Sequence, residues 1–126
     1  MTEKKNIQSF TDLVAWQEGH KLVIAIYRAT EVFPKAEVFG LTNQMRRCVI
    51  SITSNVAEGF GRQSYKEKVQ FYSLAKGSNL ELQNQMFAAR DIGFLKSNQF
   101  QALAEQSLVV GKLLTGLIKK SKEFIV

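Results

Sequence analysis

The strongest constraint on this chain is the spacing of its apolar residues, which recur every three or four positions in four long segments. That spacing places apolar side chains on one face of an α-helix, whereas a half-buried strand would need strict alternation. Residues that break helices are few, since the 126 residues include one proline, Pro34, and 8 glycines. We therefore expect an all-α protein of long helices joined by short connections.

The first two segments are bounded by residues that cap or end helices. Thr11 or Asp12 suits the start of the first, because their side-chain oxygens accept hydrogen bonds from free first-turn N–H groups. Pro34 ends it, since the residue before a proline resists the helical region. Gly59 and Gly61 suit a left-handed cap at the end of the second segment. The expected helices are at about 12–31 and 38–60.

The last two segments have clearer start and stop signals. Ser64 and Glu67 have the spacing of a capping box, in which each side chain bonds the backbone N–H of the other residue. Gly93 is expected to stop the third segment and Ser97 to cap the fourth. The expected elements are a polar tail at 1–10 and one domain at 11–122, whose last two helices lie at about 65–92 and 98–122.

Connections of only a few residues force consecutive helices to run antiparallel, which predicts a single antiparallel four-helix bundle. On the third helix, the residues expected to face the core are Phe71, Leu74, Ala75, Ser78, Leu82, Met86 and Ala89.

The chain is basic, with 17 Lys and Arg against 11 Asp and Glu, a net charge of +6 and a pI near 9.6. This balance favours a polyanion such as RNA, DNA or anionic lipid, although many proteins carry such a charge for solubility alone. One basic group surrounds the second helix and its turn into the third, and another lies at the end of the fourth. The candidate nucleic-acid contacts are Arg46, Arg47, Arg62, Lys66, Lys68, Lys119, Lys120 and Lys122.

Both basic groups also have structural explanations. Lysines in a last helical turn complement the helix dipole. Arg47 and Arg62 lie on the same stripe as Glu58, so ion pairing with Glu58 competes with phosphate binding. The charge pattern therefore favours nucleic acid without specifying it.

A second stripe on the third helix, roughly opposite the expected core face, has the spacing of another packing seam. We interpret it as the interface of a homo-oligomer; contact with single-stranded bases and simple exposure are the alternatives. The members of this stripe are Tyr65, Val69, Tyr72, Lys76, Gln83, Phe87 and Arg90.

No catalytic or metal-binding constellation is recognisable. Cys48 is the one cysteine and is expected to be a buried hydrophobe, and His20 is the one histidine, which leaves no basis for a triad or a zinc site. Glu58 and Glu81 could act as acid and base, but hydrogen bonding to arginines or helix ends is the simpler role. We expect no enzyme activity, cofactor or metal. The absence of an apolar leader or an apolar run of membrane-spanning length predicts a cytoplasmic protein with no membrane partner.

Several stretches resemble a family of four-helix-bundle proteins first seen as open reading frames in intervening sequences of bacterial 23S rRNA genes. Residues 10–17 (FTDLVAWQ) resemble the family's opening, and residues 33–37 (FPKAE) and 40–44 (GLTNQ) its first loop. The most specific similarity is at 51–62 (SITSNVAEGFGR), followed by 75–78 (AKGS) and Glu81. Together these stretches lie within a resemblance that covers roughly residues 10–120.

The resemblance implies an antiparallel bundle, typically assembled as a ring-like homopentamer with a central pore. The family is similar to the accessory protein of diversity-generating retroelements, which binds nucleic acid and a reverse transcriptase, and this likeness favours a basic nucleic-acid surface. Thr53 stands where the family often has proline, and Asn79 where it commonly has leucine. The motif residues implied to form a structural polar network are Asn55, Glu58, Gly59, Arg62, Ser78 and Glu81.

These observations lead us to expect a non-enzymatic, oligomeric accessory protein that binds RNA or DNA, with a reverse transcriptase as a candidate protein partner. The alternative is a structural protein–protein scaffold whose charge serves only solubility.

Overall fold

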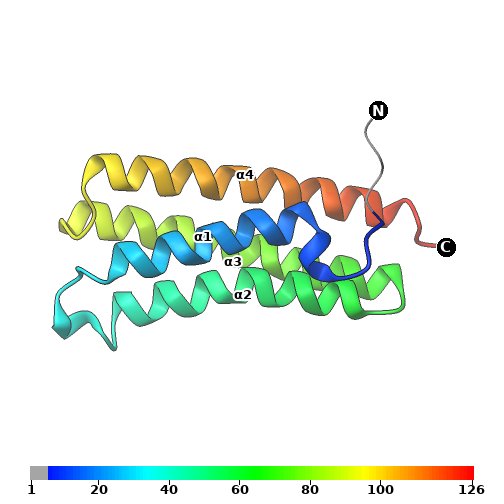
Figure 1. Cartoon of the computed structure of the whole chain (residues 1–126), viewed down its shortest axis with the longest axis horizontal. Helices are drawn as coiled ribbons and strands as arrows, with labels where there is room; N and C mark the ends of the chain where they lie inside the picture. Colours follow the sequence, from blue (N-terminus) through cyan, green and yellow to red (C-terminus); the bar gives the residue numbers. More distant parts are fainter. Residues whose placement is uncertain (1–5) are drawn as a thin grey trace.

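Helices account for most of residues 6–126, the part of the chain that the computed structural model describes. Four long helices run antiparallel to their chain neighbours, and α1 and α3 are each flanked by α2 and α4 (Figure 1). The all-α four-helix bundle expected from the sequence is confirmed. The elements are a 3-10 turn η1 (Phe10–Asp12), α1 (Val14–Thr30), a 3-10 turn η2 (Lys35–Glu37), α2 (Leu41–Gly61), α3 (Tyr65–Ile92) and α4 (Ser97–Lys122).

The bundle starts with a cap different from the one expected. Ser9 begins η1, where its hydroxyl accepts from the Thr11 N–H at 3.3 Å, and the Asp12 carboxylate accepts from the Ser9 N–H at 3.1 Å. The chain then extends at Leu13 before α1 begins at Val14. Thr11 and Asp12 therefore do not cap α1, because they lie inside the preceding turn. Of the polar tail expected at 1–10, residues 1–5 lie outside the described part.

The other helix ends follow the expected signals in part. Gly93 has a φ of 99° and ends α3, and the Phe94 N–H donates to the Ala89 carbonyl at 2.8 Å, as in a left-handed glycine cap. Half of the expected capping box forms: the Ser64 hydroxyl accepts from the Glu67 N–H at 3.1 Å, but the Glu67 carboxylate accepts from the Ser64 hydroxyl at 3.3 Å instead of from the Ser64 backbone N–H. Lys96 rather than Ser97 occupies the cap position of α4, since Ser97 is already helical.

Gly59 and Gly61 do not form the left-handed cap expected of them. Among the described residues only Gly93 has a positive φ, and α2 instead ends as Arg62 becomes extended. Gly59 is buried, and a Cβ built on it would lie 2.7 Å from the Tyr72 ring. Its small size is needed for close packing of α2 against α3.

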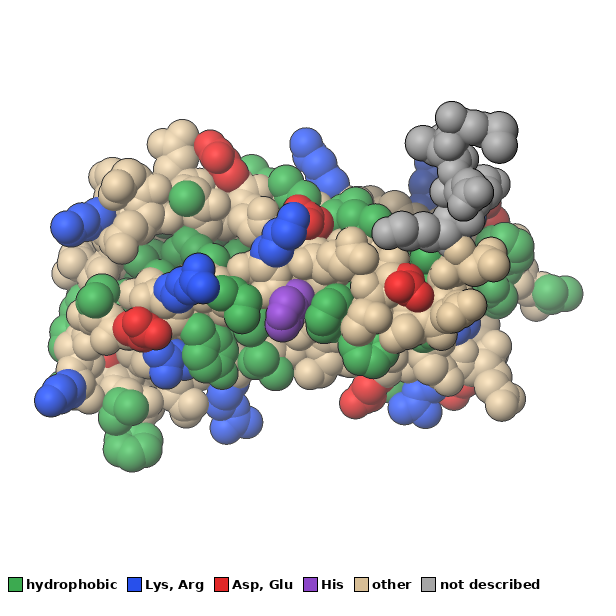
Figure 2. All heavy atoms as spheres, viewed as in Figure 1, with side chains coloured by type: hydrophobic (Ala, Val, Ile, Leu, Met, Phe, Trp, Pro, Cys, Tyr) green, Lys and Arg blue, Asp and Glu red, His purple; other side chains and the backbone are tan. Residues whose placement is uncertain are grey.

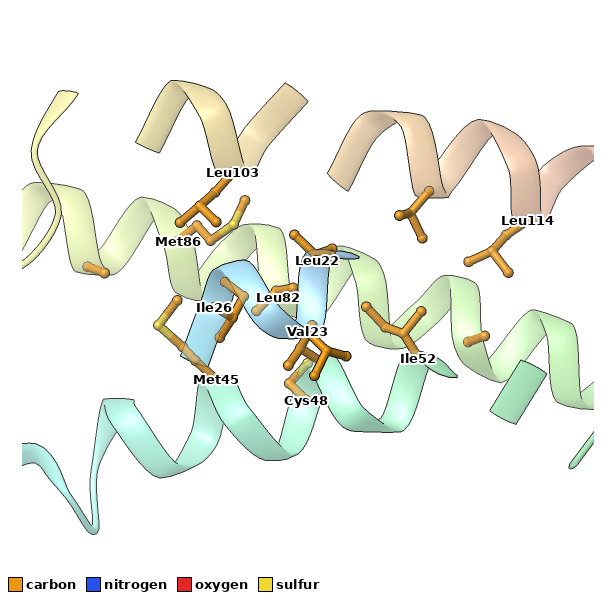
Figure 3. Close-up of a cluster of buried hydrophobic side chains, with 14 of the residues drawn as sticks. Leu22, Val23, Ile26, Met45, Cys48, Ile52, Leu82, Met86, Leu103 and Leu114 are labelled. Atoms are coloured by element: carbon orange, nitrogen blue, oxygen red, sulfur yellow. The ribbon is translucent and has the colours of Figure 1, made fainter. Parts of the chain in front are cut away.

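The core fills the space between the four helices along the length of the bundle. Side chains from all four helices point toward one another there, including Ile26 of α1, Ile52 of α2, Leu82 of α3 and Leu114 of α4 (Figure 3). Leu74 was wrongly expected to join them and is 58% exposed. The buried face of α3 follows Ala75 and Leu82, and Leu74 points away from it.

The second stripe on α3 is mostly used within the chain. Tyr72 is only 2% exposed, so its assignment to a subunit interface is wrong. The Gln83 amide donates to the hydroxyl of Ser107 on α4 at 2.8 Å. The Phe87 ring lies 5.0 Å from the ring of Phe100, which is also on α4. The physical reason is that α3 packs against two helices, so its buried arc is wider than one stripe.

Candidate nucleic-acid interface

The two basic groups of the sequence are partly brought together at one end of the bundle. The C-terminal end of α2, the N-terminal end of α3 and the C-terminal end of α4 all lie there (Figure 1). The Tyr65 ring at the start of α3 stacks on the Phe124 ring just after α4, with 4.9 Å between centroids. Lys66 thus lies at the same end as Lys119, Lys120 and Lys122, more than fifty residues away in sequence.

Three of the candidate phosphate contacts, Arg46, Arg62 and Lys68, have partners within the chain. Arg46 donates from Nε to the Thr30 hydroxyl at 2.9 Å and lies 4.7 Å from the Tyr27 ring, tying α2 to α1. The Lys68 ammonium donates to the Phe60 carbonyl at 2.6 Å, at the end of α2.

Burial lowers the pKa of Lys68 from its ordinary value. Arg62 makes a long 3.8 Å ion pair with Glu58 and lies over the Phe71 ring at 4.5 Å. Arg46 and Lys68 have mainly structural roles.

Four of the five remaining candidate cations form what we call the basic end: Lys66, Lys119, Lys120 and Lys122. All four are exposed and make no ion pair within the described part of the chain. Glu67 and Glu123 lie beside them in sequence, so the charge is not uniformly positive. On the face drawn in Figure 2, Lys and Arg are dispersed among Asp and Glu, without forming one continuous patch. This arrangement suits weak contacts to several phosphates.

Arg47 lies apart from the basic end, in the first half of α2. It is exposed and lines a polar cleft together with Glu81 of α3. The sequence grouped it with Lys66, but the length of α2 separates the two residues.

Part of the polar network implied by the resemblance is present between α2 and α3. The Asn55 amide donates to the Ser51 carbonyl at 2.8 Å and to the Ser51 hydroxyl at 3.1 Å. The Ser51 and Ser78 hydroxyl oxygens are 2.9 Å apart. These contacts join Asn55 and Ser78 in one chain of hydrogen bonds.

Glu58 does not belong to this network. Its side chain is 59% exposed and, within the described part of the chain, has only the long ion pair with Arg62, because it lies on the solvent side of α2. Gly59 contributes no polar group and instead makes room for Tyr72. Glu81 contacts the network's edge, since its carboxylate is 3.6 Å from the Cys48 sulfur.

The Cys48 thiol sits in this polar region as a donor. It donates to the Ser78 carbonyl at 3.0 Å. Burial, with a smaller effect of the nearby Glu81 carboxylate, raises the pKa of the thiol to about 12. The thiolate needed for nucleophilic attack is therefore disfavoured.

His20 stacks on Trp16, one turn earlier in α1, with 4.7 Å between ring centroids. Among residues 6–126, side chains able to ligate a metal do not gather in groups of three. None of the described helices is long and apolar enough to cross a bilayer.

A buried polar cluster lies between α3 and α4, and the sequence pattern does not predict it. Asn79 is 1% exposed; its amide donates to the Ser107 carbonyl at 2.9 Å, and its oxygen accepts from the Ser107 hydroxyl at 2.8 Å. Gly111 faces it, with only 3.2 Å between a built Cβ and the Asn79 nitrogen. The signal in the sequence was the replacement of an expected leucine by Asn79.

Comparison with known proteins agrees with this fold. Residues 11–116 match the profile of a family described as 23S rRNA-intervening sequence protein. No curated protein sequence matches significantly.

Among solved structures, a similar one is the crystal structure of a protein with unknown function from the S23 ribosomal protein family of Bacteroides thetaiotaomicron. The TM-score is 0.78 at 19% identity, covering 84% of this chain and 96% of that chain. At this identity the likeness shows the fold alone.

Proposed function

This chain belongs to the 23S rRNA-intervening sequence protein family, and on that premise we propose that it is a non-enzymatic, oligomeric accessory protein that binds RNA or DNA. The observation that carries the proposal is the basic end, where the start of α3 with Lys66 lies at the same end of the bundle as the last turn of α4 with Lys119, Lys120 and Lys122, none of them ion-paired among the described residues. Free lysines at one end of a protein of net charge +6 favour a polyanion. We place this function in the cytoplasm.

Assembly strengthens this proposal. A ring-like homo-oligomer, a pentamer by family resemblance, repeats the basic end around one axis. Contacts that are weak in one subunit then add up through multivalency. A protein partner such as a reverse transcriptase would bind elsewhere on the same ring.

We propose a non-enzymatic protein because the side chains that could react chemically are occupied in contacts within the chain. The Cys48 thiol is held protonated, and His20 is stacked on Trp16. Glu58 pairs with Arg62 on the solvent side of α2. We assign no cofactor or metal to the protein.

The test is binding of labelled single-stranded RNA and duplex DNA as a function of salt. Phosphate contacts release counterions, so affinity should fall log-linearly as salt rises from about 50 to 200 mM. Replacing Lys119, Lys120 and Lys122 with glutamine should weaken binding to all sequences. It should also reduce the salt slope for single strands by up to about 2, because each phosphate contact contributes about 0.7.

A matched control removes the same charge elsewhere. Lys21, Arg28 and Lys35 are exposed residues on α1 and η2, and their replacement with glutamine should leave the slope nearly unchanged. If both triple variants lose the same affinity, only net charge matters and the basic end is not a site. If the wild-type protein binds neither RNA nor DNA at low salt, the scaffold function replaces this proposal.

A further inference from the structure

A polar cleft opens between the first half of α2 and the middle of α3, away from the basic end. Its volume is about 480 Å³, within the range of ~300–1,000 Å³ typical of ligand pockets. Its lining includes Asn43 and Arg47 from the α2 side and Glu81 and Gln85 from α3. Glu81 and Gln85 are one helical turn apart, so their side chains lie on the same face of α3.

The floor of the cleft contains a polar side chain without its usual partner. Gln85 is 8% exposed, and its buried carbonyl oxygen has no hydrogen-bond partner among residues 6–126. Buried amides are normally satisfied, so an unpaired one calls for an explanation such as a missing ligand. Above it, the Glu81 carboxylate is exposed and makes no ion pair within the described residues. The cleft therefore offers two acceptors that lack strong donors.

The mouth of the cleft carries an unusual aromatic. Phe39, in the turn before α2, lines the cleft and is 91% exposed, so water surrounds nearly the whole ring. An exposed ring is a platform on which a nucleobase stacks, since every base has a π-face. Arg47 lies on the same side with no ion pair in the described part of the chain, and a guanidinium suits a phosphate.

We infer that this cleft binds an unstacked guanine of single-stranded RNA or DNA, an inference that rests on the proposed nucleic-acid function. Guanine presents two adjacent donors, N1–H and the 2-amino group, on its Watson–Crick edge. A carboxylate such as that of Glu81 accepts both at once, and the Gln85 amide lies alongside. Phe39 stacks on the base and Arg47 contacts a flanking phosphate.

Other occupants match the cleft less well. Adenine has one amino group on that edge, and uracil has a single N–H between two carbonyls, so neither offers two adjacent donors. An arginine side chain of a protein partner has the donors, but Arg47 and the net charge of +6 would repel it.

The test compares labelled oligouridine heptamers that differ only in the central nucleoside, which is guanosine, inosine or adenosine. Wild-type protein should bind the guanine heptamer about tenfold more tightly than the adenine one, the discrimination expected for one bidentate pair. Inosine lacks the 2-amino group and should lose most of that advantage. Glu81→Gln should bring the guanine-to-adenine ratio close to one, because an amide cannot accept two hydrogen bonds at these positions.

Matched variants distinguish the specific effect of the cleft residues from a general effect of charge or of exposed apolar side chains on RNA binding. Glu105→Gln removes an exposed carboxylate from α4 and should keep the ratio, although both Glu variants gain overall affinity from the loss of one negative charge. Phe39→Ala should weaken the guanine and adenine heptamers by at least about fivefold. Val32→Ala, which removes another exposed apolar side chain (75% exposed), should not.

The outcomes distinguish this inference from the proposed function. Equal affinity of the wild type for guanine and adenine heptamers, with a long RNA still bound, overturns the guanine site alone. Failure to bind the long RNA overturns both. If light scattering gives Phe39→Ala a lower mass than the wild type while the guanine preference is retained, Phe39 is a subunit contact, and its stacking role is overturned.

Discussion

Close packing at Gly59 is what brings α2 and α3 together near their connection. A Cβ at this position would lie 2.7 and 2.9 Å from two atoms of the Tyr72 ring and 3.0 Å from the Phe71 Cβ. Tyr72 is 2% exposed and has little space in which to move. The glycine in the family-like motif is thus explained by sterics, with no need for a left-handed backbone.

Gly59→Ala should lower the free energy of unfolding by about 1–3 kcal/mol, the usual cost of overpacking a tight contact. Gly77 is the matched control, since it lies inside α3 with nothing within 4 Å of a built Cβ. Gly77→Ala should raise stability by about 0.5–1 kcal/mol, because alanine is the better helix former. Urea unfolding followed by CD measures both. Opposite signs are expected, and equal shifts would contradict the steric explanation.

At the scale of helices, periodicity and breakers predicted four elements and the stop at Gly93. They could not give the rotation of α3, because a helix with two neighbours buries a wide arc that contains both Tyr72 and Ala75. The free cations of the basic end were recognisable from sequence. The structural roles of Arg46 and Lys68 were not, since their partners include backbone carbonyls of other segments, those of Tyr27 and Phe60.

The Asn79–Ser107 cluster sets how α3 sits on α4. Both residues are at most 1% exposed, and the two hydrogen bonds between them can form at only one register. Buried polar pairs of this kind specify alignment at some cost in stability. A leucine at Asn79 would leave the register to apolar packing.

Ser107→Ala should cost about 1–3 kcal/mol, because it leaves the buried Asn79 oxygen without a donor. The double change Asn79→Leu with Ser107→Ala should recover more than half of that loss, since it also removes the buried Asn79 oxygen, while the part-buried Gln83 amide loses its Ser107 acceptor equally in both variants. Thermal or urea unfolding reports both effects. Ser73→Ala, at an exposed position of α3, is the control and should change stability by less than about 0.5 kcal/mol. A double variant less stable than Ser107→Ala would show that apolar packing cannot replace the cluster.

For the whole molecule, the surface divides into regions that do not overlap. The basic end and the polar cleft occupy different parts of the bundle, so a nucleic-acid strand would need to run between them or between subunits. A third region is a groove of about 360 Å³ on the outer side of α3 and α4, lined by Leu80 and Leu108. These leucines are 58% and 57% exposed, with Lys76 and Lys112 at the edges. Neighbouring exposed apolar side chains with a charged rim are typical of a protein interface.

That groove, which keeps Lys76 and Gln83 of the stripe but not the buried Tyr72, becomes the expected subunit contact. In a ring, each subunit presents one surface to the next and receives a different one, so the groove need supply only one side of the contact. Light scattering should give a mass several times the 14.2 kDa of one chain. Leu80→Asp with Leu108→Asp should reduce the mass toward that of one chain while the helical CD signal is retained, because desolvating two carboxylates in an apolar contact costs more than pairing with Lys76 and Lys112 returns. Val32→Asp with Ile92→Asp adds the same charge at exposed apolar positions outside the groove and should leave the mass unchanged. A monomeric wild type would contradict the ring, and an oligomer unaffected by the groove variant would place the contact on another face.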